Sequence, residues 1–338
     1  MSEGKRIISM SHGSGGKLSH ELITGLFLKK LNNPILAQLE DSAFIQIGDL
    51  PLVFTTDSYV VKPIFFPGGD IGKLAVYGTV NDISVMGARP LFISCGFIIE
   101  EGMDYTLLEK IVDSISAAAE KARVKIVTGD TKVVERGSGD GLFINTSGIG
   151  IIENGVHLGI GNIKVGDKII LSGTLGDHGI AVLSCREGFN FQSEIVSDSA
   201  PLWDMVSGML KISRKIRFMR DPTRGGLGTL LNEVALGSSF CVMIEEAQLP
   251  VREDVRSLCE IIGIDPIYVA NEGKLVAIVA PDDAEAVLKV MKGYPEGIEA
   301  RLIGEITEEH KGKVCLATMV GGLRIIDMFV GDQLPRIC

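Results

Sequence analysis

The chain has 338 residues, of which 33 are Lys or Arg and 43 are Asp or Glu, so its formal net charge is −10. A protein that binds nucleic acid or an anionic membrane needs clustered basic residues to neutralise phosphates, and this acidic balance argues against both. The hydrophobic fraction of 46% and the charged fraction of 22% are ordinary for a packed globular protein, and the length favours two domains.

The sequence contains no predicted membrane helix. Its longest uncharged stretch is the twelve residues from Gly141 to Ile152, whereas a spanning helix needs about 20 apolar residues. The N-terminus has charged residues but no apolar segment of the kind that secretory signals carry. We therefore expect the protein to act in the cytoplasm.

Two residue types stand out in the composition. The six cysteines have no CxxC spacing, so neither a zinc site nor a disulfide framework is predicted. The 41 glycines are about 12% of the chain, above the ordinary share of about 7%. An excess of glycine indicates that at some positions the backbone, rather than a side chain, performs the function.

The first half alternates helical and extended patterns in chain order. Apolar spacing predicts a helix over 18–31 after a glycine loop, and a hairpin of strands 42–48 and 52–56 joined at Asp49. Asp70 and Asp104 are predicted N-caps of two further helices, and strands are expected at 124–127 and 142–152. The pattern predicts an α+β layer in which helices cover one face of a sheet.

The second half begins the alternation again after a segment rich in Gly and Asn. Helices are predicted at 179–186, 201–212, 223–236, 251–262 and 282–291, and strands at 168–172, 240–244, 275–279 and 300–305. We expect a first domain over 1–155, a second α+β domain over 156–330 and a mobile tail over 331–338.

Five aspartates lie among Gly, Ser or Thr at the end of an apolar run: Asp41, Asp57, Asp82, Asp130 and Asp221. Each alone is typical of a helix cap or a turn. Five in the same setting favour oxygen ligands for Mg²⁺, with room left for phosphate groups.

The loop HGSGGK (12–17) precedes the first predicted helix, so Gly15 and Gly16 could present backbone N–H groups to an anion, with Lys17 as a point charge. It is not a Walker A loop, because the GxxxxGK[ST] order is absent. Glu272 is either a turn residue or a general base, for a proton that Lys132 helps to position. His178 is a loop residue or an anion contact.

Cys338 is the last residue of the sequence, at the end of the predicted tail. One interpretation is a chance cysteine, and the other is a carrier thiol on a tether. Eight extended residues reach about 26 to 29 Å, which is enough to bring a bound group into a cleft. The carrier interpretation is favoured, because an exposed thiol without a purpose is a liability.

The motifs together resemble the HypE family of hydrogenase maturation proteins, which are carbamoyl dehydratases in the superfamily of aminoimidazole ribonucleotide synthetase, selenophosphate synthetase and thiamine-monophosphate kinase. The resemblance covers essentially the whole chain and rests on the segments HGSGGK, LEDSA, TTDSYVVKPIFFPGGDIGKLAVYGTVNDISVMGA, VTGDTKVV, SGTLGDHGIAVLS, DPTRGGL, VANEGK and PRIC. It implies two domains of the aminoimidazole ribonucleotide synthetase type and a homodimer whose N-terminal sheets pair into a barrel.

The resemblance also implies an activity. A carbamoyltransferase, HypF, would load a carbamoyl group onto Cys338, and the chain would dehydrate it to a thiocyanate with ATP and Mg²⁺. The cyanide would pass to a HypC–HypD iron scaffold complex for the [NiFe] hydrogenase centre.

Residue by residue, the resemblance implies metal and nucleotide contacts from Asp41, Asp57, Asp82 and Asp221, nucleotide contacts from Gly15, Gly16, Lys17, Asn81 and Asp130, and proton removal by Glu272 and Lys132. Two alternatives remain open. One is a sister kinase or synthetase that acts on a free small molecule, and the other is a thiol carrier without catalysis.

Overall fold

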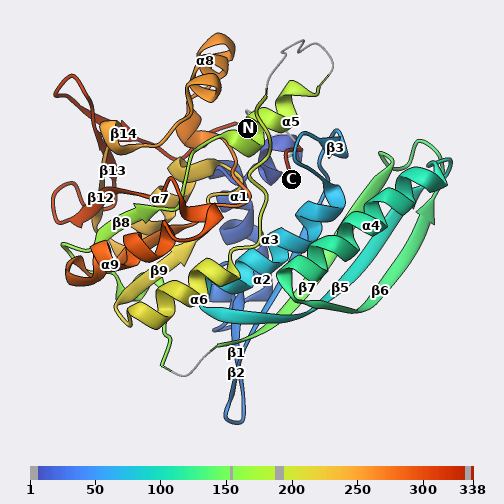
Figure 1. Cartoon of the computed structure of the whole chain (residues 1–338), viewed down its shortest axis with the longest axis horizontal. Helices are drawn as coiled ribbons and strands as arrows, with labels where there is room; N and C mark the ends of the chain where they lie inside the picture. The colour runs from blue at the N-terminus through green and yellow to red at the C-terminus, as the bar shows by residue number, and fades with distance from the viewer. Residues whose placement is uncertain (1–6, 153–154, 187–193, 332–335) are drawn as a thin grey trace, which may run out of the picture.

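The computed structural model describes residues 7–152, 155–186, 194–331 and 336–338 (Figure 1). Two sheets divide the chain, one built from residues before 153 and one from residues after 167. Both halves mix helices and strands, as the sequence predicts. None of the helices in the described ranges is long and apolar enough to cross a membrane.

The first sheet has five strands in the order β1-β2-β7-β5-β6. Their bounds are β1 Ala43–Ile47, β2 Leu50–Tyr59, β5 Ala88–Glu100, β6 Lys125–Val134 and β7 Leu142–Ile152. All neighbours are antiparallel except β5 and β6, which are parallel and joined by a helix. A small hairpin, β3 (Phe65–Phe66) with β4 (Gly69–Asp70), lies before the first long helix.

Two helices, α3 (Ile71–Val85) and α4 (Tyr105–Ala122), cover one face of this sheet (Figure 1). Both begin at the predicted caps, since the Asp70 carboxylate accepts the N–H groups of Gly72 and Lys73 and that of Asp104 accepts Thr106 N–H. Helix α3 is buried on nearly every side, because it also contacts α6 and β9 of the other half. It therefore joins the two halves.

The second sheet has seven strands in the order β14-β13-β10-β12-β8-β11-β9. Their bounds are β8 Lys168–Leu171, β9 Ile216–Arg220, β10 Cys241–Glu245, β11 Val276–Val279, β12 Arg301–Thr307, β13 Val314–Ala317 and β14 Leu323–Ile326. The helices of this half are α5 Asp177–Ser184, α6 Trp203–Ile212, α7 Gly226–Ser238, α8 Glu253–Ile262 and α9 Pro281–Met291. Separate apolar clusters involving α7 on one side and α6 with α9 on the other indicate that helices cover both faces of this sheet.

Four strands of the two large sheets in the described residues were not predicted, namely β5, β9, β13 and β14, and neither was the small hairpin of β3 and β4. Strand β5 contains a proline and a glycine, which usually interrupt strands. Here the β5–β7 register shifts between Pro90 and Phe92, so the missing N–H of the proline falls at an irregularity of the ladder. Strand β6 is also longer than predicted.

The N-terminal helical segment is less regular than predicted. It consists of α1 (Lys17–Leu22), one π-helical stretch (Ile23–Leu28) and α2 (Lys29–Leu31). Short 3₁₀ helices lie at Met10–Gly13, Leu36–Gln38, Ile160–Asn162, Glu246–Gln248, Pro266–Tyr268 and Pro295–Gly297.

The end of the predicted tail is docked rather than free. Residues 332–335 lie outside the described residues. In the part that follows, the carbonyls of Arg336 and Cys338 accept hydrogen bonds from Lys62 N–H and Val60 N–H, and Ile337 is buried in the core beneath the first sheet. Residues 336–338 are therefore docked in this structure, and the expected mobility of the tail stays a prediction.

Candidate functional site

A cavity of about 530 Å³ is lined by residues from both halves of the chain. Its walls come from the glycine loop before α1, the segment before β1, strand β2, helix α3, the end of β9, helix α7 and the segment before β11. Seven carboxylates line it against two guanidinium groups; the carboxylates are Glu40, Asp41, Asp57, Asp82, Asp221, Glu233 and Glu272. The site is therefore acidic beyond what its own cations neutralise.

Arg220 is the main internal counter-charge. Its buried guanidinium forms ion pairs with Asp41 at 2.8 Å, Glu40 at 3.1 Å and Glu233 at 2.8 Å. These carboxylates raise the pKa of Arg220 against the opposing effect of burial, so it stays charged. One guanidinium thus organises three carboxylates along one wall of the cavity.

The negative charges of the other aspartates are less fully balanced by neighbouring cations. Burial, together with the neighbouring carboxylates of Asp221, Asp41 and Asp57, raises the pKa of Asp82 well above its ordinary value. Its Oδ2 accepts a hydrogen bond of 2.9 Å from Thr55 Oγ1. Burial and the charge of Asp41 likewise raise the pKa of Asp221. Carboxylates that oppose each other's ionisation in this way favour a bound cation.

Glu272 lines the cavity from the segment before β11. Its side chain is buried, and its Oε1 atom has no hydrogen-bond partner among the residues that the structure describes. Its backbone is fixed from two sides, since its N–H donates to Asp198 and its carbonyl accepts from Asn81. Burial and the charges of Asp221 and Asp198 raise its pKa well above the ordinary value, which makes it a stronger base than an exposed glutamate.

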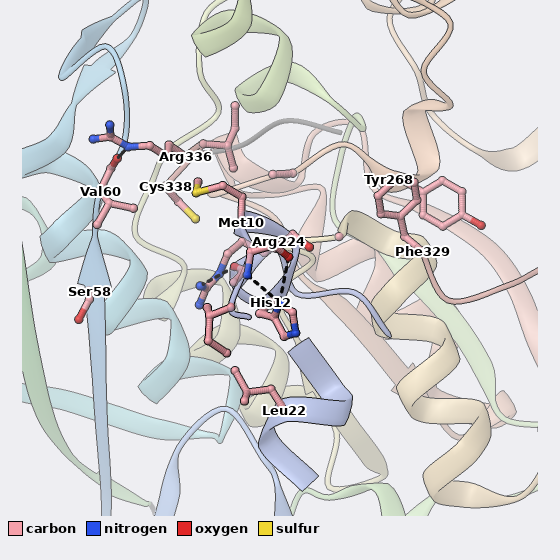
Figure 2. A pocket seen from close by; sticks show the side chains of 17 residues that line it. Met10, His12, Leu22, Ser58, Val60, Arg224, Tyr268, Phe329, Arg336 and Cys338 are labelled. Atoms are coloured by element: carbon pink, nitrogen blue, oxygen red, sulfur yellow. Dashed lines mark hydrogen bonds between the residues drawn. The ribbon is translucent and has the colours of Figure 1, made fainter. Parts of the chain in front are cut away.

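Cys338 lies where this cavity meets a second one of about 440 Å³, and it lines both. Figure 2 shows Met10, His12 and Arg224 gathered around the space close to the Cys338 side chain. Burial raises the pKa of this thiol, Arg224 opposes that effect, and Glu272 adds to it. The docked thiol is therefore neutral at ordinary pH and lies within electrostatic reach of the carboxylates.

The glycine loop packs differently from the phosphate cradle that the sequence predicts. The N–H of Gly15 donates to Ser19 Oγ and that of Lys17 to the Phe329 carbonyl, so neither faces the cavity. Gly15 has φ +81°, and an added Cβ would lie 2.7 Å from the Arg224 carbonyl oxygen. At Gly16, an added Cβ would overlap the carbonyl oxygen of Phe329. The glycines allow close packing of the loop, and Lys17 is exposed outside the cavity wall.

Of the predicted site residues, the structure brings seven to the cavity: Gly15, Asp41, Asp57, Asp82, Asp221, Glu272 and Cys338. It does not bring Asp130 or Lys132 there within one chain; they pair with each other at 2.7 Å on β6, an exposed edge strand. Asn81 lies behind the wall, where its amide donates to the carbonyls of Ala200 and Glu272 and accepts Leu202 N–H. Its position favours a supporting role over nucleotide contact.

Sequence reasoning missed the roles of Arg220, Glu233 and His178. Arg220 directly precedes Asp221 in the motif MRDPTRGG, and an Arg next to a proposed ligand is the signal that could have found it. His178 is not in a loop but in α5, where its ring contacts the backbone of the docked tail. Only the tertiary structure places it there.

The cavity fits Mg²⁺ in the type and charge of its donors. Carboxylate oxygens are the ligands that this ion prefers, and the excess buried negative charge needs a cation. Among the described ranges, however, no three carboxylate, imidazole or thiol groups converge closely enough to form a metal site. The proposed ligands share one cavity without forming a closed ligand shell.

Comparison with known families agrees with this arrangement. A model of the AIR synthase related protein N-terminal domain matches residues 39–152, and the corresponding C-terminal domain model matches residues 164–316. The chain is therefore a two-domain protein of the AIR synthase type.

Individual relatives narrow the assignment. The carbamoyl dehydratase HypE of Bradyrhizobium diazoefficiens is 51% identical over 332 residues, covering 98% of this chain and 96% of that protein. A crystal structure of a HypE–HypF complex has a chain with a TM-score of 0.87 and 47% identity, covering 91% of this chain and 99% of that one. A HypE structure in complex with ATP has a TM-score of 0.83 and 48% identity, with 98% and 100% covered. The chain belongs to the HypE family of carbamoyl dehydratases.

Proposed function

We propose that this chain dehydrates a carbamoyl group carried on its own Cys338, using ATP, and so supplies cyanide ligands for [NiFe] hydrogenase maturation. One observation carries the proposal: Cys338 lies on the same cavity as the buried carboxylates and Glu272. ATP as the second substrate is supported by the ATP complex of a HypE protein that is 48% identical to this chain.

The reaction balances in two steps. The carboxamide oxygen attacks the γ-phosphorus of ATP, so a C–O–P linkage forms, ADP leaves and one N–H proton is lost. Removal of the second N–H proton then expels phosphate, and the carbon–nitrogen bond becomes the triple bond of a thiocyanate. Phosphorylation is needed because the oxygen of a carboxamide is otherwise a poor leaving group.

The residues of the cavity have distinct tasks in this scheme. Glu272 accepts a proton from the amide nitrogen, for which its raised pKa and free Oε1 suit it. Arg224, half-exposed beside Cys338, faces the charge that develops on the transferred phosphoryl group. Asp41, Asp57, Asp82 and Asp221 would hold Mg²⁺. When bound, this ion supplies neutralisation of phosphate charge.

A homodimer is supported by the open face of the first sheet. Helices α3 and α4 cover the other face, whereas Phe54, Phe92 and Ile149 are cross-strand neighbours that remain 39% to 42% exposed. Lys132 lies on this open face, because its register partner on β5 is the exposed Ile98. Pairing of two open faces into a barrel would bury Asp130 and Lys132 in the interface, the setting in which their predicted roles can be tested.

The partners follow from the same assignment. A HypF-type carbamoyltransferase is the proposed carbamoyl donor, supported by the HypE–HypF complex whose HypE chain is 47% identical to this one. The HypC–HypD scaffold as cyanide acceptor and the cytoplasmic location stay predictions.

Mass spectrometry of the carbamoylated protein tests the function directly. With MgATP and no partner present, the Cys338 peptide should lose the mass of one water. Glu272→Gln should bind nucleotide yet retain the carbamoyl form, and Lys132→Ala should slow its loss. A carbamoyl group that persists in the parent protein with MgATP would indicate a carrier without catalysis. ATP turnover with a free small molecule after Cys338→Ala would favour a sister kinase.

A further inference from the structure

The last three residues of the chain lie beside residues 60–62 like an added antiparallel strand. Val60 N–H donates to the Cys338 carbonyl at 3.1 Å, and Lys62 N–H donates to the Arg336 carbonyl at 3.1 Å. The Arg336 side chain returns to Val60, where its Nε donates to the carbonyl at 2.8 Å. Two of the three tail carbonyls are thus held by the chain that follows β2.

The third carbonyl points to the other side and is held by His178. Its Nε2 lies 2.9 Å from the Ile337 oxygen, and its Nδ1 lies 2.8 Å from Ser197 Oγ. A carbonyl can only accept, so Nε2 carries the hydrogen and Nδ1 accepts from the Ser197 hydroxyl. The two contacts fix both the tautomer and the direction of the ring.

The surroundings of His178 hold it rigidly. The ring is completely buried and packs edge-on against Phe66, with centroids 5.5 Å apart at 86°. Ser197 is held in turn, since its N–H donates to the Pro67 carbonyl at 2.8 Å and its Oγ accepts Ser199 N–H at 3.2 Å. The loop between β3 and β4 therefore supports the serine, which supports the histidine.

We propose that His178, oriented by Ser197, is the positioning residue that holds the Ile337 carbonyl and so fixes the Cys338 thiol at the carboxylate cavity. His178 lines neither of the two cavities at the thiol, so it acts through the tail backbone and not on the reacting atoms. The consequence for catalysis rests on the proposed function, whereas the consequence for docking does not.

Thiol labelling measures docking without ATP or a carbamoyl group. Of the six free cysteines, four are buried, Cys185 is exposed and Cys338 is half-buried. In a Cys185→Ser background, Cys338 is therefore the reporter for alkylation by iodoacetamide. His178→Leu removes a hydrogen bond to a buried carbonyl and should speed labelling about 3- to 10-fold.

Matched variants separate positioning from general loosening. His178→Gln keeps an N–H donor near the position of Nε2 and should restore slow labelling, and the exposed His157→Leu should label like the parent. If His178→Leu does not fold, Ser197→Ala, which removes only the support of the ring, should still speed labelling. Equal labelling rates in the parent, a folded His178→Leu and Ser197→Ala would overturn the proposal.

Single-turnover dehydration supplies the second readout. His178→Leu should slow thiocyanate formation from the carbamoylated protein at saturating MgATP, leave the Kd for ATP unchanged and be rescued by His178→Gln. Failure of the parent to form thiocyanate, with labelling as expected, would reject the proposed function and leave the positioning role intact. Normal dehydration in all variants, with unchanged labelling, would reject the positioning role alone.

Discussion

The side-chain amide of Asn81 donates a 3.0 Å hydrogen bond to the backbone carbonyl of Glu272, and so connects helix α3 of the first half to the segment before β11 of the second. The same amide donates to Ala200 and accepts from Leu202. A single buried side chain thus sets the distance between the proposed general base and the wall that carries Asp82.

Replacing Asn81 tests this connection. Asn81→Asp keeps the acceptor for Leu202 N–H but places a carboxylate against two carbonyls that have lost their donor. Loss of a buried donor costs about 1 to 3 kcal/mol, so urea unfolding should show a clear loss of stability. Dehydration should slow while nucleotide affinity is kept. Ser84→Ala, which removes only a hydrogen bond within α3, should leave dehydration unchanged, and an equal loss of dehydration in both variants would refute the connection.

Asp82 should oppose stability when no cation is bound. Burial and the neighbouring carboxylates raise its pKa, so Asp82→Asn removes a charge that the folded protein disfavours and should raise Tm in EDTA. The same change should shrink the rise in Tm that MgATP produces, because a ligand that binds the folded state more weakly stabilises it less at the same concentration. Thermal unfolding with and without MgATP measures both effects. Asp49→Asn in the exposed turn after β1 is the control, and an undiminished MgATP effect in Asp82→Asn would remove Asp82 from the proposed ligands.

Arg220 should be far more important for stability than surface arginines. Arg220→Leu leaves three carboxylates without their shared partner, and breaking a buried ion pair from one side costs about 3 to 5 kcal/mol. The exposed Arg123, paired with Asp204, should contribute no more than about 1 kcal/mol when changed to Ala. Denaturant unfolding of the two variants compares them. Similar losses in both would show that the carboxylates around Arg220 do not need its charge.

The open face of the first sheet should be a dimer interface. Phe92 lies on this face with 42% of its surface exposed, so Phe92→Glu would place a charge in the apolar contact and should yield monomers. Light scattering coupled to size-exclusion chromatography measures the mass. Tyr105→Glu is the control, because Tyr105 is 81% exposed at the start of α4, outside that face. A parent protein that is monomeric at all concentrations would reject the interface.

The sequence predicted those parts of the fold and site that local pattern determines. Asp70 and Asp104 cap their helices as expected, because capping is decided within four residues. Strand β5 was missed because Pro90 is tolerated only through a register shift against β7, which depends on a distant strand. Motif spacing found the carboxylates. It did not find the roles of Arg220 and His178, since their partners are distant in sequence.

In the glycine loop too, some features follow from the local sequence and others depend on residues distant in sequence. The sequence predicts that Gly15 and Gly16 present N–H groups to an anion, with Lys17 as a point charge. In the structure the N–H of Gly15 donates within the protein instead, as does that of Lys17. The partners that occupy these groups are Ser19 and Phe329. The Phe329 contact joins the start of the chain to its end, and no local pattern encodes it.

The buried His178 should weaken the protein's stability in acid, although Asp198 and the Ile337 carbonyl that it holds oppose the effect of burial on its pKa. Burial lowers the pKa of His178 from its ordinary value of 6.5. Between these two values the unfolded chain binds a proton that the folded protein excludes, so the free energy of unfolding falls as the pH drops below about 6.5 and through the lowered pKa. Above about 6.5 this contribution is absent.

His178→Gln cannot titrate, so its Tm should fall less than that of the parent between pH 7.5 and pH 5.5. The effects of the other four histidines, which both proteins share, cancel when the change in Tm of one protein is compared with the change in Tm of the other. Equal pH dependence of Tm in the two proteins would show that the pKa of His178 is not lowered in the folded protein.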